Sequence, residues 1–331
     1  MLKGKHIRHR RRWVIGVWAL ILVLAGIVLT PFVEPYLVEQ EKTELIDAGL
    51  PASVQDLRVV YVSDFAQGGW PSMTISRAAG IMRDVNRQIP DLVLLGGDYA
   101  ASPEGTIAFF EAMPRVSASL GCYAVLGEKD RHISLTDAQK KEILRERDPD
   151  GVLDETGRQA LLEEAEEAAN AERIERLRAV MAAKGITLLV NETASVRYGD
   201  GTIVIVGMDE PTYGRPNFTA AARQVTSGQY VILLAHNPSQ IEEAIKAADA
   251  NGAQDWFDLA LFGHTMGNQF FGGFNPLGIA ADVTTASHRK GWIREAHDTP
   301  MLISRGIGTV GLPVRLGCRP QIHVIDIRKN R

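Results

Sequence analysis

Five apolar stretches of this chain each run into a short motif that carries a carboxylate or an imidazole. The stretches are LRVVYV, DLVLL, YAVL, YVILL and LALF, a composition typical of strands buried on both faces. The motifs that follow them are Ser63-Asp64-Phe65-Ala66, Gly96-Gly97-Asp98, Gly127-Glu128-Lys129-Asp130, Ala235-His236-Asn237 and Gly263-His264-Thr265-Met266-Gly267. Because the carboxyl ends of strands line the ligand crevice of open α/β sheets, we expect these side chains to converge. Oxygen and nitrogen donors of this kind suit a transition metal.

Each candidate metal ligand also has an interpretation without a metal. The candidates are Asp64, Asp98, Glu128, His236 and His264. A strand-end aspartate can simply cap a helix, and an isolated histidine there is usually a hydrogen-bonded core residue. Glu128 could also turn toward Lys129 or Arg131. The repetition of one context at five strand ends favours metal binding, and Gly263 would allow the backbone to approach a ligand closely.

The order and spacing of the motifs resemble the calcineurin-like metallophosphoesterases, whose pattern runs D-x-H, G-D, G-N-H-D, H and G-H-x-H. The resemblance is greatest to the membrane-anchored branch, in which a phosphoesterase domain follows a transmembrane segment. It extends to VEPYLVEQ, LAHNPSQ, GHTMGNQ and ISRGIGTVGLPVRLGCRP, and covers roughly residues 31 to 328. It implies a four-layer α/β/β/α sandwich preceded by one transmembrane helix.

The chain departs from this pattern at two of the family's histidines. In such enzymes two metals share the G-D aspartate, which corresponds to Asp98. The first metal also needs both D-x-H residues and the last histidine, but Ala66 and Met266 stand at the two histidine positions. Alanine cannot bind a metal, and a thioether is a poor ligand for hard divalent cations. The first site therefore keeps only Asp64 and Asp98.

The second site of the pattern is better preserved. The resemblance gives it Asp98, His236 and His264, with Glu128 in place of the family's asparagine. It therefore implies a divalent metal (Mn, Zn, Fe or Mg), with one ion rather than two.

Three candidate catalytic residues lie around the third motif: Lys129, Asp130 and His132. A buried carboxylate without a partner is costly, so something should neutralise Asp64 if the first metal is lost. We expect the Lys129 ammonium to take over that role by pairing with Asp64 or Asp98; the alternative is a surface lysine. Lys129 also stands where the family's G-N-H-D motif has its histidine, and His132 could replace that lost acid or lie outside the site.

The amino-terminal region predicts a membrane anchor. Residues 1–12 hold six basic residues and no acid, and residues 13–33 carry no charge over a length that crosses a bilayer as a helix. A cleaved signal peptide is the alternative, but no A-x-A-like site follows. The positive-inside rule predicts a cytoplasmic tail at 1–12, a single span at 13–33, and an extracytoplasmic domain at the cell membrane. We expect a linker at 34–56 and the phosphoesterase-like domain at 57–331.

The composition limits the classes of partner that the domain can bind. The chain has 331 residues, 45% of them hydrophobic, with 36 basic and 40 acidic residues, so the part beyond the basic tail is acidic. An acidic domain is a poor candidate for nucleic acid, whose binding relies on cationic contacts to phosphate. The two cysteines, Cys122 and Cys318, could pair in an oxidising compartment or remain buried thiols.

Strands and helices alternate through the domain. Strands are predicted at 57–63, 91–96, 122–126, 186–190, 194–199, 202–208, 230–235, 257–262, 301–305 and 321–327, with helices at 72–88 and 105–115. The Gly-Asp-Gly between two alternating runs predicts a hairpin over 194–208. Residues 135–183 predict a charged helical insert. It either covers the domain edge or acts as a lid or an arm for a protein partner.

Two functions remain open on the sequence alone. The first is a metal-dependent hydrolase of phosphate esters or pyrophosphates, with one metal and Lys129 in place of the second. A tether keeps such a site near the bilayer, so lipid-linked phosphates are natural substrates, and the resembled branch includes hydrolases of lipid A-type glycolipid synthesis. The second is a catalytically inactive relative that binds a metal, a phosphate or a lipid headgroup and recruits a partner.

Overall fold

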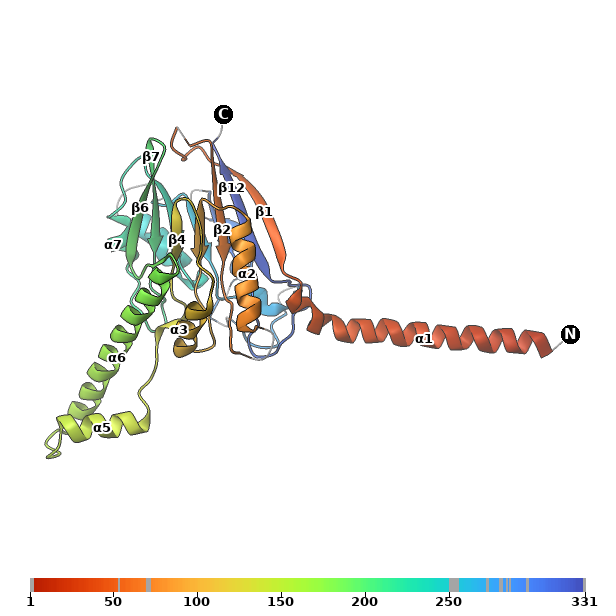
Figure 1. Cartoon of the computed structure of the whole chain (residues 1–331), viewed down its shortest axis with the longest axis horizontal. Coiled ribbons are helices and arrows are strands. Elements are labelled where there is room, and N and C mark those ends of the chain that lie inside the picture. The colour runs from red at the N-terminus through yellow and green to blue at the C-terminus, as the bar shows by residue number, and fades with distance from the viewer. Residues whose placement is uncertain are drawn as a thin grey trace.

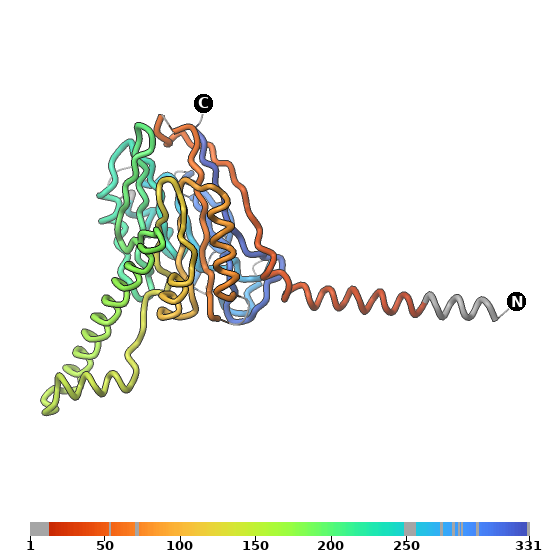
Figure 2. Tube along the Cα trace, in the orientation of Figure 1, coloured from red at the N-terminus to blue at the C-terminus, as the bar shows by residue number. Residues whose placement is uncertain are grey.

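A computed structural model describes most of the chain. It covers residues 3–52, 54–69, 73–249, 256–271, 274–279, 282–283, 285, 287–295 and 298–329, with the backbone alone at 3–12 and 248–249. Two six-stranded sheets form the domain, and a long helix extends away from it (Figures 1 and 2).

The first sheet carries three of the predicted motifs. Its strands, in spatial order, are β1 (Glu39–Ile46), β12 (Gln321–Arg328), β2 (Asp56–Val62), β3 (Leu92–Leu95), β4 (Gly121–Ala124) and β5 (Ile186–Leu188). Strands β2 to β5 run parallel, and β12 is antiparallel to β2. The carboxyl ends of β2, β3 and β4 therefore lie at one edge of this sheet.

The second sheet carries the two histidine motifs. Its order is β10 (Gly291–Glu295), β11 (Thr299–Ile303), β9 (Leu259–Phe262), β8 (Tyr230–Leu234), β7 (Gly201–Gly207) and β6 (Glu192–Tyr198). Strands β7, β8, β9 and β11 are parallel, while β6 and β10 run antiparallel at the two edges. The predicted hairpin is confirmed as β6–β7.

The two sheets pack face to face and bury a shared apolar layer. Leu57, Tyr61, Ile205, Ile232 and Leu261 are among its fully buried members. Each such side chain contributes about 1.5–3 kcal/mol through its removal from water. Because parallel strands are covered on both faces, their sequences are continuously apolar rather than alternating.

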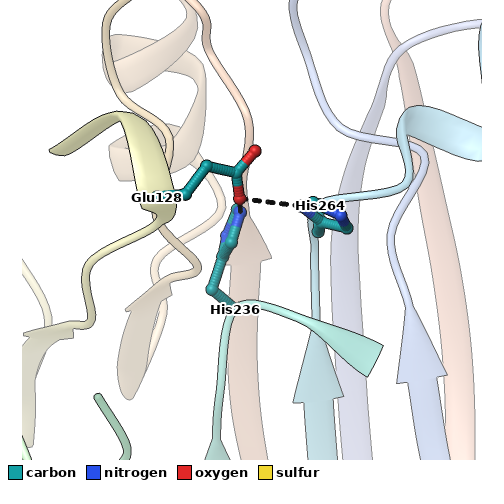
Figure 3. A group of neighbouring side chains, drawn as sticks. All are labelled: Glu128, His236 and His264. Atoms are coloured by element: carbon teal, nitrogen blue, oxygen red, sulfur yellow. Dashed lines mark hydrogen bonds and ion pairs between the residues drawn. The ribbon is translucent and has the colours of Figure 1, made fainter. Parts of the chain in front are cut away.

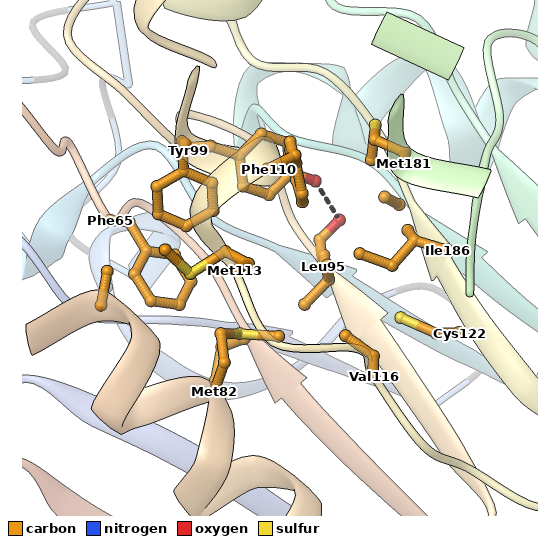
Figure 4. Packing of buried hydrophobic residues seen from close by; sticks show 14 of the residues in the cluster. Phe65, Met82, Leu95, Tyr99, Phe110, Met113, Val116, Cys122, Met181 and Ile186 are labelled. Atoms are coloured by element: carbon orange, nitrogen blue, oxygen red, sulfur yellow. Dashed lines mark hydrogen bonds between the residues drawn. The ribbon is translucent and has the colours of Figure 1, made fainter. Parts of the chain in front are cut away.

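Helices cover the two outer faces. On the first sheet lie α2 (Ile75–Arg87), α3 (Pro103–Ala112) and the carboxyl half of α6 (Glu155–Ala183), over a cluster that includes Phe65, Tyr99, Phe110 and Met181 (Figure 4). The second sheet is covered by α7 (Phe218–Ala222) and α8 (Ile241–Asp249). The predicted four-layer α/β/β/α sandwich is confirmed.

Residues 34–56 are not the linker that the sequence suggests. After η1 (Glu34–Tyr36), the segment EQEKTELI forms β1, which pairs in parallel with β12 along eight residues. Its side chains alternate between half-buried and exposed, as in an edge strand with one solvated face. The many charged residues of this segment do not form the apolar pattern typical of a strand, so the sequence does not predict β1. Strand β10 is not predicted either. The first sheet therefore begins at Glu39 rather than at residue 57.

The two segments outside the sandwich are both helical. Most of helix α1 (Lys3–Val33), together with η1, forms an apolar span, Trp13–Tyr36, with mean hydropathy 2.5. No residue of its most apolar window is buried against the domain. The insert forms α5 (Asp137–Arg147) and α6, whose amino-terminal half projects with α5 from the domain (Figure 1). Cys122 and Cys318 are both buried free thiols, so they do not pair.

Candidate metal centre

The motif loops place several residues in left-handed backbone conformations. Asp64, Asp98 and His264 have φ values of 55°, 55° and 67°. Such conformations are unfavourable for residues with a Cβ, and they persist where the surrounding fold fixes them, often at functional sites. At each position the chain turns sharply after its strand, which aims the side chain into the crevice rather than along the strand.

Glu128, His236 and His264 form the first group of neighbouring ligand-type side chains (Figure 3). Oε2 of Glu128 lies 2.9 Å from Nδ1 of His264 and 3.4 Å from Nε2 of His236. One carboxylate oxygen thus faces a ring nitrogen of each histidine, although the three residues follow strands of two different sheets. Burial alone would raise the pKa of Glu128, but the two imidazoles lower it well below the usual range.

The ring of His236 is oriented in a way that suits a metal ligand. Its Nδ1 lies 2.6 Å from the carbonyl oxygen of Gly96, to which it donates in the tautomer that leaves Nε2 with a lone pair. The residue is fully buried, and Nε2 has no hydrogen-bond partner among the described residues. A buried polar atom without a hydrogen bond costs free energy of folding. A backbone carbonyl that fixes the ring while the other nitrogen faces carboxylates is the usual arrangement around a metal-binding histidine.

A second group, Asp64, Asp98 and His236, adjoins the first, and all three side chains are buried. Their ligand atoms lie within 4.8 Å of one another, and His236 belongs to both groups. Burial raises the pKa of Asp64, with a further increase from the charge of Asp98. The backbone N–H of His264 donates to both oxygens of Asp64, at 3.0 and 3.2 Å. This hydrogen bond joins the first sheet to the second at the site.

Lys129 lies in this crevice and not at the surface. Its ammonium donates to Oδ2 of Asp98 and lies 3.6 Å from Oε1 of Glu128. Burial alone would lower the pKa of Lys129, but these carboxylates raise it. The pairing with Asp98 is one of the two that the sequence suggested; a hydrogen bond between Lys129 and Asp64 is not formed.

Apolar side chains occupy the positions of the two missing histidines. Ala66 and Met266 are buried in one small cluster with Ile279. Both retain a left-handed backbone, with φ values of 47° and 48°. At these two positions of the resembled pattern the chain therefore holds buried apolar side chains on left-handed backbone.

Asp130 is not placed as a catalytic group. Its buried carboxylate accepts hydrogen bonds from the backbone N–H groups of Asp98, Tyr99 and Gly127 and from the hydroxyl of Thr106. Burial raises its pKa to about 6, with a contribution from Asp98. With four donors around its two oxygens, Asp130 holds the second and third motif loops together.

His132 lies away from the ligand groups. Its Nε2 is 3.1 Å from Glu166 of α6, and its ring stacks on Tyr213 at a centroid distance of 4.7 Å. The backbone turns outward after α4 (Glu128–Arg131), so His132 joins the insert to the domain instead of facing the crevice.

Asp282 is a site residue that the sequence did not indicate. Its Oδ1 lies 3.0 Å from Nε2 of His264, and its Oδ2 accepts from the amide of Asn237. The hydrogen bond from His264 lowers the pKa of Asp282 to about 2. Asp282 follows no predicted strand and belongs to none of the five motifs, so no sequence signal could have selected it.

The chain was compared with known proteins. No family model matches it. YpbG of Bacillus subtilis, an uncharacterised protein, is 32% identical over 158 residues, which is 47% of this chain and about half (53%) of that protein. An uncharacterised metallophosphoesterase of Aquifex aeolicus is 25% identical over 304 residues, 89% of this chain and 91% of that protein. A transmembrane protein with metallophosphoesterase domain from Danio rerio is 27% identical over 292 residues, 85% of this chain and 55% of that protein.

The chain is thus similar over most of its length to proteins named metallophosphoesterases, and its four-layer fold and converging ligand groups are consistent with that similarity. The prediction from the five motifs is confirmed at this level.

Proposed function

We propose that the protein is a membrane-anchored, metal-dependent phosphoesterase that holds one divalent cation between Glu128, His236 and His264, with Asp98 beside it. The observation that carries this proposal is the buried Nε2 of His236. It has no hydrogen-bond partner among the described residues, and it faces Glu128 at 3.4 Å and Asp98 at 3.6 Å. Carboxylate and imidazole donors in this arrangement fit Mn²⁺, Zn²⁺, Fe²⁺ or Mg²⁺.

A divalent cation bound here would polarise a phosphoryl oxygen and lower the pKa of a bound water. Both effects promote the hydrolysis of phosphate esters. The residues of the chain do the positioning. Gly96 fixes the His236 ring through its carbonyl oxygen, and Asp282 orients His264 through Nε2. Both contacts hold ligand side chains in place before substrate arrives, which reduces the cost of organising the site.

Lys129 supports the proposal by supplying positive charge beside the carboxylates. Its ammonium is hydrogen-bonded to Asp98 and about a quarter of its side chain is exposed, at 26%. An ammonium in this position neutralises part of the charge that a second cation would otherwise balance, and it can attract a phosphate oxygen. With one cation and one ammonium, we expect hydrolysis that favours good leaving groups, such as a pyrophosphate or an aryl ester.

The substrate class follows from the anchor. Helix α1 has the length and hydropathy of a single membrane span, and the basic tail before it favours a domain outside the cytoplasm under the positive-inside rule. We therefore propose a cell-membrane location and a phosphate ester or anhydride of a membrane-associated lipid as the substrate.

The test is metal analysis and hydrolysis with the full chain in detergent. Wild type should carry close to one divalent ion per chain and hydrolyse bis(p-nitrophenyl) phosphate or p-nitrophenyl phosphate. His236→Ala should lose both the metal and the activity. His132→Ala is the matched control, because that histidine packs on Tyr213 outside the ligand groups, and it should keep both. Retention of the metal in His236→Ala would refute the ligand assignment.

A second function is favoured by one observation, the apolar cluster of Ala66, Met266 and Ile279. With this patch in place of two histidines, the protein would bind a metal, a phosphate or a lipid headgroup without turnover. Helix α5 buries none of its residues, so the arm formed by 135–183 offers a charged surface to a protein partner. Metal bound at one equivalent, with no hydrolysis of any tested ester, would favour this alternative.

A further inference from the structure

The end of the anchor is fastened to the domain by specific hydrogen bonds. The carbonyl oxygen of Pro31 accepts from the backbone N–H of Arg315 at 2.9 Å. The buried carboxylate of Glu34 accepts from the N–H groups of Gly317 and Cys318, at 2.8 and 2.7 Å. No flexible linker separates the apolar span from these contacts. The anchor therefore sets which loops of the domain lie at the bilayer.

A groove beside α1 shows how deep those loops lie. It has a volume of about 600 Å³ and is lined by Gly26, Leu29 and Val33 of the helix and by Leu316 of the facing loop, among others. Gly26 and Leu29 belong to the apolar span. If these helix residues are in the membrane, Leu316 across the groove lies at the same depth, because it lines the same space.

Exposed apolar side chains continue from this groove onto neighbouring loops. Phe271, Phe274 and Leu312 are 60%, 64% and 51% exposed. The backbone N–H of Phe271 donates to the carbonyl oxygen of Leu316 at 2.8 Å, and that of Phe274 donates back to Phe271 at 3.3 Å. Gln269 binds Leu312 through its side-chain amide at 3.3 Å. These contacts place Phe271, Phe274 and Leu312 on loops next to the segment of Leu316, and Figure 1 shows blue loops gathered where α1 leaves the sandwich.

The same loop also contacts the last motif of the metal centre. The thiol of Cys318 donates to the carbonyl oxygens of Met266 and Gly267, both at 3.4 Å. His264 stands two residues before Met266 in this motif. A surface that rests on the bilayer at Leu316 would thus hold the metal centre a short distance above the lipid headgroups.

We propose that Phe271, Phe274 and Leu312 form a second membrane contact that inserts into the surface of the lipid bilayer beside α1. This inference rests on the proposed membrane anchoring by α1. Aromatic and aliphatic side chains at the level of the headgroups are favoured because they leave water while their backbone stays hydrated. Phe271, Phe274 and Leu312 are large, exposed apolar side chains on loops near a membrane span. The lipid bilayer is the surface whose chemistry matches them.

The test is spin labelling of the full chain in phosphatidylcholine–phosphatidylglycerol vesicles. Cys122 and Cys318 are buried, so a nitroxide reagent should label an introduced cysteine selectively. The variants are Phe274→Cys and a matched control, Ile89→Cys, which is 82% exposed and lies just before β3, at the amino end of that strand. Leu22→Cys, in the middle of the apolar span, reports whether α1 is inserted.

Collision of each label with oxygen, which concentrates in lipid, is compared with collision with a water-soluble nickel chelate. We expect the oxygen-to-nickel ratio to be several-fold higher at position 274 than at 89, and highest at 22. A ratio at 274 equal to that at 89 overturns the second contact, and so does a label at 274 shielded from both colliders, which would mean a protein cover.

The readout distinguishes this inference from the proposals on which it depends. A water-accessible label at position 22 would overturn the anchor and the second contact together. The measurement needs neither turnover nor bound metal, so a negative result at 274 leaves the phosphoesterase proposal standing. A circular-dichroism spectrum and a Tm equal to those of wild type show that each variant is folded.

Discussion

Replacing Lys129 by methionine tests whether an ammonium has taken over the electrostatic role of a second cation. The substitution keeps most of the side-chain volume and removes the charge. Asp98 is fully buried and would lose the ammonium on Oδ2, keeping the backbone N–H of Lys129 on Oδ1 at 3.1 Å. Asp64, also fully buried, would lose a nearby positive charge.

The expected cost can be estimated from the burial of the pair. Removing one partner of a buried ion pair costs about 3–5 kcal/mol, because the remaining charge stays buried and uncompensated. Since 26% of the lysine side chain is exposed and water can partly take its place, we expect the lower end, about 3 kcal/mol. For a domain of this size that corresponds to a Tm lower by roughly 6–12 °C.

The assay is thermal unfolding of the full chain in detergent with a metal chelator. Lys246→Met is the matched control, because Lys246 pairs with Glu242 on an exposed helix face, and its loss should cost less than about 0.5 kcal/mol. Added Mn²⁺ should restore the Tm of Lys129→Met more than it raises that of wild type, since the group of Asp64, Asp98 and His236 can then take a cation. Equal Tm values for the two variants in chelator would refute the reasoning.

Three further predictions concern Asp130, the two missing histidines of the first metal site, and the buried His323. Asp130→Asn should lower the Tm and weaken metal binding, because its NH2 group would replace one accepting oxygen and face at least one backbone N–H donor, at a cost of about 1–3 kcal/mol; calorimetry and metal analysis would check this. The double variant Ala66→His with Met266→His should raise the metal content from one ion toward two, and an unchanged content in folded protein would contradict it. Burial lowers the pKa of His323 from 6.5 to about 3, so its neutral form stabilises the fold above pH 6.5 and this stability is lost as the pH falls toward 3. Between pH 7 and 5 wild type should lose about 2 kcal/mol more than His323→Asn, measured by denaturant unfolding at each pH.

The sequence predicted the sheets and the convergence of the ligands. Buried parallel strands need continuous apolar runs, so β2, β3, β4, β8 and β9 could be recognised directly from their composition. Once their carboxyl ends share an edge, the residues that follow them must lie close together. This geometric necessity is why the five candidate ligands appear as two neighbouring groups.

The roles within the third motif could not be predicted, because they depend on the direction of a short turn. Glu128, Lys129, Asp130 and His132 lie within five positions of one another, yet they point to different surroundings. Glu128 and Lys129 face the crevice, Asp130 turns back under the loops, and His132 packs on Tyr213. Spacing along the chain does not fix which of these directions each side chain takes.

By itself the sequence determined which strands are buried, which residues end them, and that an apolar span precedes the domain, since each is set by local composition and pattern. Only the tertiary structure decided that a charged segment completes the first sheet as β1, that Asp282 supports His264, and that Glu34 fastens the anchor to Gly317 and Cys318. These are contacts between residues far apart in the chain. Which residues meet in such contacts depends on how the two sheets and their loops pack. This packing produces no local sequence pattern from which the contacts could be predicted.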